Sequence, residues 1–168
     1  VGTWCVIDRI LTTEGEIHAL VKGVARVKLS ELVSTDPFLV GRVTEMAEVV
    51  ENTDEAKAAS KHLASEFRRA VSLGKSVDYM VFIKLMSGVE GAELVDQIAY
   101  ALEAKAEEKQ KVLETASVLE RTKMVIKLLA TEMNMLELER SIEHKTHAKF
   151  EKQMRDAMLR ERKKVIEK

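Results

Sequence analysis

The feature that most constrains the fold is the last third of the sequence, from Ser117 to Lys168, which contains neither glycine nor proline. These residues are the usual breakers of a helix, so the whole stretch can continue as one helix. At about 1.5 Å of rise per residue, such a helix would be roughly 75 Å long. Ser117 and Glu120 have the spacing of a capping box, so we expect the helix to begin there.

Apolar residues are unevenly distributed along this predicted helix. Its first half carries a seam at a spacing typical of helix packing, formed by Leu119, Ile126, Leu129, Met133 and Leu136. Charged residues dominate past Glu137, and the apolar positions thin out to Ile142, Phe150, Met154 and Met158. A helix this polar cannot be buried along its length, so its second half should project from the rest of the protein.

The first 50 residues carry the signals of β-strands. Four runs rich in β-branched residues are separated by turn-forming letters: WCVIDRIL, IHALV, ARVKLSELV and PFLVGRVTEM. We expect a hairpin turn at Glu14-Gly15, a break at Gly23 and a fourth strand opened by Pro37. The third run alternates as a half-buried strand does, with one face formed by Ala25, Val27 and Leu29.

Residues 51–116 predict a helical bundle. The stretch from Asn52 begins with capping residues and places one apolar face on Ala56, Ala59, Leu63, Phe67 and Ala70. Shorter helices are expected at 77–86, 92–102 and 107–113. The predicted fold class is therefore α+β, with a partial β-rich subdomain (1–50), a helical bundle (51–116) and a long projecting C-terminal helix (117–168).

Composition narrows the classes of partner. The formal net charge is −1, which is no general reason to expect nucleic acid or a membrane surface as partner. Cys5 is the single cysteine, which suits a reducing, cytoplasmic compartment. No apolar run approaches the ~20 residues of a membrane span. Because the sequence does not start with methionine and ends without a helix stop, we expect it to be part of a longer protein.

Gly74-Lys75-Ser76 matches the last three letters of a phosphate-binding loop. The full loop needs another glycine five residues before Gly74, where this sequence has Arg69, and it should follow a strand rather than a predicted helix. We therefore expect Gly74 to end one helix and Ser76 to cap the next. No nucleotide or other cofactor site is predicted in this chain.

One group of side chains on the long helix could in principle bind a divalent ion. Glu143, His147 and Glu151 share a face, and His144 lies beside them. A solvated charged face with two incidental histidines is the favoured interpretation, so no metal site is predicted. The sequence also contains no convergent set of catalytic residues, so we expect no enzyme activity from this chain alone.

A basic cluster lies at the end of the chain, formed by Arg160, Arg162, Lys163, Lys164 and Lys168. No aromatic residue is interleaved for stacking on single-stranded nucleic acid, and acidic neighbours dilute the charge that would attract phosphates. A solvated helix end is therefore favoured over a nucleic-acid site.

Two apolar regions could contact partner proteins. The run YMVFIKLM is expected to pack the bundle through Met80, Val81, Phe82, Ile83, Leu85 and Met86, with a surface for binding other proteins as the alternative. On the projecting helix, contact with another protein or a neighbouring subunit is predicted for Ile142, Phe150, Met154 and Met158.

The order of strands, bundle and long helix resembles the amino-terminal region of the Lon family of ATP-dependent proteases. Three stretches carry the resemblance. The first has Leu20, Val21, Gly23 and Arg26 after a strand and hairpin. The second, AEEKQKVLET, has a K-Q-x-L-E-like turn at Lys109, Gln110, Val112, Leu113 and Glu114. The third has a helix pattern at Glu120-Arg121, Glu132, Leu136, Glu139 and Ile142.

The resemblance implies a substrate-recognition and assembly part of a hexameric serine protease that degrades misfolded, damaged and selected regulatory proteins. ATP, magnesium and a serine-lysine dyad would belong to ATPase and peptidase parts outside this chain, and family members have additional strands before Val1. Unfolded or damaged proteins would be the clients, bound through apolar surface. The alternative is a purely structural coiled-coil arm that organises or gates the ring without touching clients.

Overall fold

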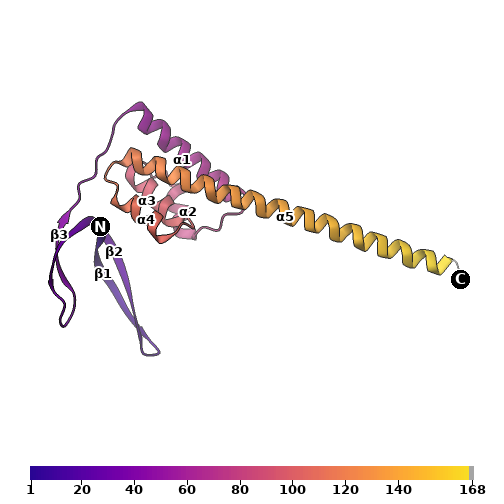
Figure 1. The fold of residues 1–168 in the computed structure, drawn as a ribbon, viewed down its shortest axis with the longest axis horizontal. Coiled ribbons are helices and arrows are strands. Elements are labelled where there is room, and N and C mark those ends of the chain that lie inside the picture. The colour runs from indigo at the N-terminus through magenta and orange to yellow at the C-terminus, as the bar shows by residue number, and fades with distance from the viewer. Residues whose placement is uncertain (167–168) are drawn as a thin grey trace.

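The computed structural model describes the backbone of residues 1–166 and the side chains of residues 1–162. Its element order is β1 (Gly2–Thr13), β2 (Glu16–Ser34), β3 (Val40–Glu45), α1 (Asp54–Ser72), α2 (Tyr79–Met86), α3 (Gly91–Ala101), α4 (Ala106–Glu114) and α5 (Val118–Ile166). Figure 1 shows the sheet on one side, the helical bundle in the middle and α5 projecting away from both. The predicted α+β class and the long projecting helix are confirmed.

The sheet is antiparallel, with β2 between β1 and β3. The hairpin turn at Glu14-Gly15 is confirmed, and both residues have positive φ. The predicted break at Gly23 is wrong, because β2 runs through it with a register shift opposite Trp4 and Cys5. A glycine inside a strand can accommodate such an irregularity without ending the strand. The prediction for Pro37 is also wrong, since β3 begins three residues later.

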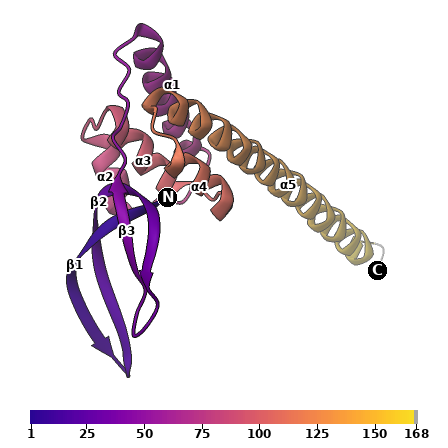
Figure 2. The same ribbon diagram turned by 60° about the vertical axis from the view of Figure 1, so that its left-hand side comes forward.

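The sheet buries very little. Val27 is its single buried side chain, and Leu29, which was expected on the same buried face, is 52% exposed. Alternation predicts burial only where a second layer covers the sheet. Figure 2 shows the strands extending away from the helices, so within the described residues no layer covers most of either face.

Local signals set the ends of α1 and α2. Thr53 caps α1 by accepting a hydrogen bond from the amide of Ala56. Gly74 follows the end of α1 with a positive φ of 109°, as predicted. The predicted Ser76 cap is wrong, because the carboxylate of Asp78 caps α2 by accepting from two backbone amides.

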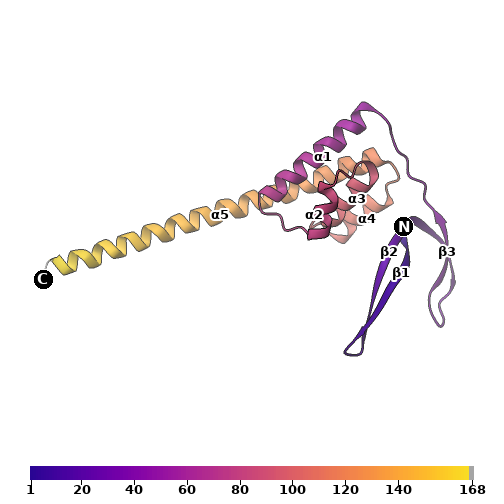
Figure 3. The same ribbon diagram turned by 180° about the vertical axis from the view of Figure 1, so that it is seen from behind.

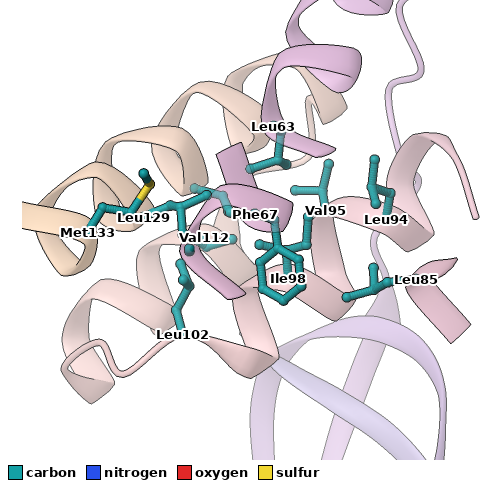
Figure 4. Close-up of a cluster of buried hydrophobic side chains, with 12 residues drawn as sticks. Leu63, Phe67, Leu85, Leu94, Val95, Ile98, Leu102, Val112, Leu129 and Met133 are labelled. Carbon is teal, nitrogen blue, oxygen red and sulfur yellow. The ribbon is translucent and has the colours of Figure 1, made fainter. Parts of the chain in front are cut away.

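The core lies where α1 and α3 meet the first part of α5. Leu63, Val95, Ile98 and Leu129 are fully buried there (Figure 4), as is Val125. Figure 3 shows α1 running alongside this part of α5, which therefore belongs to the bundle. The predicted apolar face of α1 is confirmed at its three buried residues, Leu63, Phe67 and Ala70.

The short helix α2 buries only one side. Leu85 is buried and Val81 and Phe82 are half-buried, whereas Met80, Ile83 and Met86 are exposed. The prediction that the whole run packs the core is therefore wrong for these last three residues. An eight-residue helix lying on the bundle surface can turn only one face to its neighbours.

The start of α5 is held by Glu51, a residue far away in the sequence. The Ser117 hydroxyl accepts from the amide of Glu120, but the returning half of the predicted capping box is replaced. The carboxylate of Glu51 accepts from the Ser117 hydroxyl and from the amide of Leu119 at 3.1 Å. These hydrogen bonds, led by that of Ser117, lower the pKa of Glu51. The linker between β3 and α1 is thereby fastened to the first turn of α5.

Candidate client-binding surfaces

Two arginines from distant parts of the chain meet on the same two carboxylates. Arg121 of α5 is fully buried and donates to Glu48 at 2.7 Å and to Asp96 at 3.0 Å. Arg26 of β2 donates to Asp96 at 2.6 Å and forms an ion pair with Glu48. We call this cluster the arginine joint. It ties together β2, the β3–α1 linker, α3 and α5.

The arginine joint is balanced in charge and borders a cavity of about 990 Å³ between β2, the β3–α1 linker, α3 and α4. Burial raises the pKa of Asp96, the charge of Arg26 opposes that rise, and the negative charge of Glu48 adds to it. Two guanidinium groups and two carboxylates neutralise one another, so no charge is left over for a substrate. The joint therefore positions the sheet on the bundle and has no catalytic geometry.

Lys75, the lysine of the Gly74-Lys75-Ser76 sequence, is engaged inside the protein. Its ammonium is buried and pairs with the carboxylate of Glu132 on α5. The other oxygen of Glu132 accepts from the backbone amide of Glu103. Lys75 thus holds the α1–α2 connection against α5, and it does not point to a phosphate.

Several of the residues that carry the family resemblance make connections between distant parts of the chain. The Gln110 amide donates to the backbone oxygen of Val1 at 2.9 Å, and the Lys109 ammonium donates to the backbone oxygen of Tyr100. Arg26 and Arg121 form the joint. The sequence analysis missed their partners Glu48 and Asp96. The one available signal was that a buried arginine needs nearby counter-charges, which does not say where they lie in the sequence.

An apolar cavity of about 270 Å³ lies where α1, α2 and α3 meet. Its lining is Ala64, Phe67, Arg68, Val71, Phe82, Leu85, Met86 and Leu94. We call it the α1–α3 pocket. Figure 4 shows Leu85 and Leu94 at the opposite end of the core from Leu129 and Met133 of α5. The flexible, exposed methionines of α2 were the only sequence signal for this surface.

Three large side chains form an exposed patch on the projecting half of α5. Phe150, Met154 and Met158 follow one another at intervals of four residues and are 60–65% exposed. We call them the distal helix patch. Ile142 is also exposed, and at about 100° per residue it lies about 80° around the helix from Phe150, as Met158 does in the opposite direction. The four predicted contact residues are therefore all accessible, but they wind around the helix and do not share one straight stripe.

The remaining polar candidates on α5 are dispersed. His147 contacts Glu151 at 3.4 Å, and within residues 1–162 no group of three histidine, cysteine or acidic side chains is placed to bind a metal. Arg160 and Arg162 are exposed, whereas the other members of the basic cluster, Lys163, Lys164 and Lys168, have side chains outside the described residues. Among the described helices, none combines the length and apolar character that crossing a membrane requires.

Comparison with known proteins identifies the family. The family model of the ATP-dependent protease La (LON) substrate-binding domain matches residues 1–131. The Lon proteases of Syntrophomonas wolfei and Heliobacterium modesticaldum are each 32% identical over 169 residues, which cover 100% of this chain and 21% of those proteins. The Lon protease of Clostridium acetobutylicum is 33% identical over 171 residues, covering 99% of this chain and 22% of its own length.

A solved structure shares the fold. The N-terminal domain of the Mycobacterium avium complex Lon protease superimposes with a TM-score of 0.62 at 23% identity, covering 77% of this chain and 69% of that one. The chain spans about a fifth of the length of its curated relatives, and the matched family is a substrate-binding domain. The prediction that these residues are not a protease domain is therefore confirmed. The chain belongs to the family of LON substrate-binding domains.

Proposed function

We propose that this chain recognises unfolded or damaged proteins on behalf of a Lon-type ATP-dependent protease. The proposal rests on the location of the large apolar side chains that remain exposed in the folded chain. They gather on the sheet, on α2 beside the α1–α3 pocket and in the distal helix patch, while the bundle core is closed. Exposed apolar surface of this extent marks interaction sites, and unfolded proteins expose the apolar segments that would fit them.

The proposed mechanism is differential affinity. A folded protein hides its apolar segments, so only unfolded chains gain free energy by contacting these surfaces. The flexible methionines of α2 and α5 can adapt to many apolar partners. Each contact must offset the cost of ordering a flexible client, so we expect weak binding, with a Kd on the order of micromolar.

The wider setting is part of the same proposal. ATP hydrolysis with magnesium and peptide cleavage by a serine-lysine dyad belong, in this proposal, to parts of the longer relatives that this chain does not span. Residues 117–168, which contain α5, are the proposed third unit of the chain and lead towards those parts. Residues 1–50 and 51–116 are the proposed β-rich and bundle units. We further propose a homo-hexameric assembly and, since Cys5 is the single cysteine, the cytoplasm. Nucleic acid and membranes are not proposed as partners.

Binding of one protein in two states tests this function. Fluorescence anisotropy would compare reduced, carboxymethylated α-lactalbumin with the native calcium-bound form. We expect micromolar binding of the unfolded form and binding at least about tenfold weaker for the native form, because only the unfolded form offers apolar segments. Equal affinity for the two forms would rule the proposal out.

The exposed distal helix patch favours a second candidate, a structural arm that pairs with neighbouring subunits. Phe150→Ser with Met154→Ser in a full-length relative carrying this domain should then weaken assembly in sedimentation experiments. Gln153→Ser with Ala157→Ser is the matched control, with the same spacing on a neighbouring face. Weakened assembly with unchanged binding of unfolded α-lactalbumin would support the arm; weakened client binding with unchanged assembly would exclude it.

A further inference from the structure

A row of basic residues leads to the α1–α3 pocket along helix α1. Lys57, Lys61, Ala64, Arg68 and Val71 follow one another at alternating intervals of four and three residues, which places them on one face of the helix. The last three line the pocket. Lys57 and Lys61 are exposed, so the apolar pocket continues into a positively charged ridge.

The charges of this ridge are not neutralised within the part of the chain that the structure describes. Neither lysine forms an ion pair there, and nor does Arg68. Charged residues nearby are paired elsewhere: Arg69 with Glu66 and Glu137, and Glu55 with Lys123. On the other side of the pocket, Lys84 of α2 pairs with Glu93 of α3. The ridge is thus the unpaired charge beside the pocket, and it attracts an anionic partner.

The dimensions suit a peptide. A cavity of about 270 Å³ lies just below the range of small-molecule sites, so it suits one large apolar side chain. Lys61 and Arg68 are separated by about 10 Å along the axis of α1, the length covered by about three residues of an extended chain. An extended segment can therefore seat an apolar side chain in the pocket and reach both basic residues.

Building on the proposed function, we propose that the α1–α3 pocket binds one large apolar side chain of an extended client segment whose neighbouring acidic residues pair with Lys57, Lys61 and Arg68. The apolar anchor supplies most of the affinity. The exposed ion pairs contribute little each, but they select acidic over basic segments because like charges repel. The chain would thus read charge as well as apolar character.

Three labelled peptides test the pocket by fluorescence anisotropy with the full 168-residue chain. The first peptide has a central phenylalanine, with glutamates one and three positions away from it on each side. The second peptide has lysines in place of these glutamates. The third keeps the glutamates but has serine in place of the phenylalanine. At low salt we expect the first peptide to bind about tenfold more tightly than either of the others. The preference over the lysine peptide should shrink as salt is added, because salt screens exposed charges.

Matched variants locate the site. Lys61→Glu with Arg68→Glu should reverse the preference between glutamate and lysine peptides. Lys111→Glu with Lys127→Glu changes net charge equally on exposed positions of α4 and α5 and should leave the preference intact. Ala64→Phe, which fills the half-buried pocket wall, should abolish binding of the first peptide, and Met86→Ser at an exposed lining position should weaken it. Circular dichroism would confirm that each variant is folded.

Several results would overturn the proposal. Equal effects of the two charge-reversal pairs would mean that only the overall charge matters, and unchanged peptide binding by both Ala64→Phe and Met86→Ser would mean that the pocket stays empty. Dimers that dissociate on Ala64→Phe would identify a second copy as the occupant. Binding of unfolded α-lactalbumin distinguishes a failure of the pocket proposal from a failure of the proposed function. If all variants still bind α-lactalbumin, only the pocket proposal is refuted. If the chain binds the peptides but not α-lactalbumin, only the proposed function is refuted.

Discussion

The two halves of α5 form one continuous helix but are stabilised differently. In the first half, Val125, Leu129 and Met133 are buried in the bundle, and Arg121 and Glu132 form buried ion pairs. From Glu137 to Arg162, no side chain is buried. Apart from the ion pair of Glu137 with Arg69 of α1 at its start, that half relies on helix propensity and on local contacts such as His147 with Glu151. Continuity of a helix is therefore no evidence that it is packed along its length.

The largest contrast should come from matched leucines. Leu129→Ala removes a fully buried side chain and should lower the free energy of unfolding by about 2–5 kcal/mol, because it leaves a cavity in the core. Leu159→Ala, at a position that is mostly exposed, should change it by less than about 0.5 kcal/mol. Urea unfolding followed by circular dichroism measures both. Similar effects of the two would mean that the far half of α5 is packed after all.

The second-largest effect on stability is expected at the arginine joint. Arg121→Met keeps most of the apolar contacts of the side chain but leaves Glu48 and Asp96 facing only Arg26. The free energy of unfolding should fall by about 1–3 kcal/mol. This is less than for a fully buried ion pair, because the two carboxylates are 36% and 40% exposed and water partly screens their charges. Arg140→Met, an exposed arginine in the far half of α5, is the control. A loss no greater than that of the control would show that the joint contributes no stability.

A smaller, pH-dependent effect should come from the start of α5. The folded protein lowers the pKa of Glu51, so the ionised carboxylate contributes stability above its ordinary pKa of about 4.5, and this contribution is lost as the pH falls through the lower folded value. Glu51→Gln should therefore reduce the unfolding midpoint at pH 7 and have a shrinking effect below about pH 4.5. A difference between the two proteins that grows on acidification would contradict this assignment.

The smallest effect on folding is expected at the distal helix patch. Phe150→Ser with Met154→Ser should change the free energy of unfolding of the bundle by less than about 0.5 kcal/mol, because no core contact is lost. Helix content should fall slightly, because serine has a lower helix propensity than methionine. Differential scanning calorimetry and far-ultraviolet circular dichroism separate the two quantities. Loss of the cooperative unfolding transition would show that α5 folds back onto the bundle.

What the sequence predicted, and what it missed, follows the range of the interactions. The turn at Glu14-Gly15 and the long uninterrupted helix depend on local propensity, so they were predictable. The errors at Gly23 and Ser76 arose where strand pairing or a better cap prevailed over a local signal. The arginine joint could not be predicted, because Arg26 and Asp96 are brought together by the packing of the sheet against the helices rather than by sequence spacing.

The pocket was missed for a related reason. Its walls come from three helices, and the angle between α1 and α2 decides whether Arg68 and Met86 line one cavity. Sequence periodicity shows which side of each helix is apolar but not how two short helices cross. The exposure of Phe150 and Met154, in contrast, followed directly from the charged residues around them.

The depth at which α5 is anchored turns this helix into a lever. Its fixed point is the bundle, where the buried side chain of Leu129 and the Lys75–Glu132 ion pair hold the helix, and the projecting part extends to Ile166. Over the roughly 50 Å from Met133 to that residue, a tilt of only about 10° at this fixed point would sweep the far tip through about 9 Å. A change in packing around α1 and α3 that tilted the helix would therefore displace its far end by more than it displaces the core.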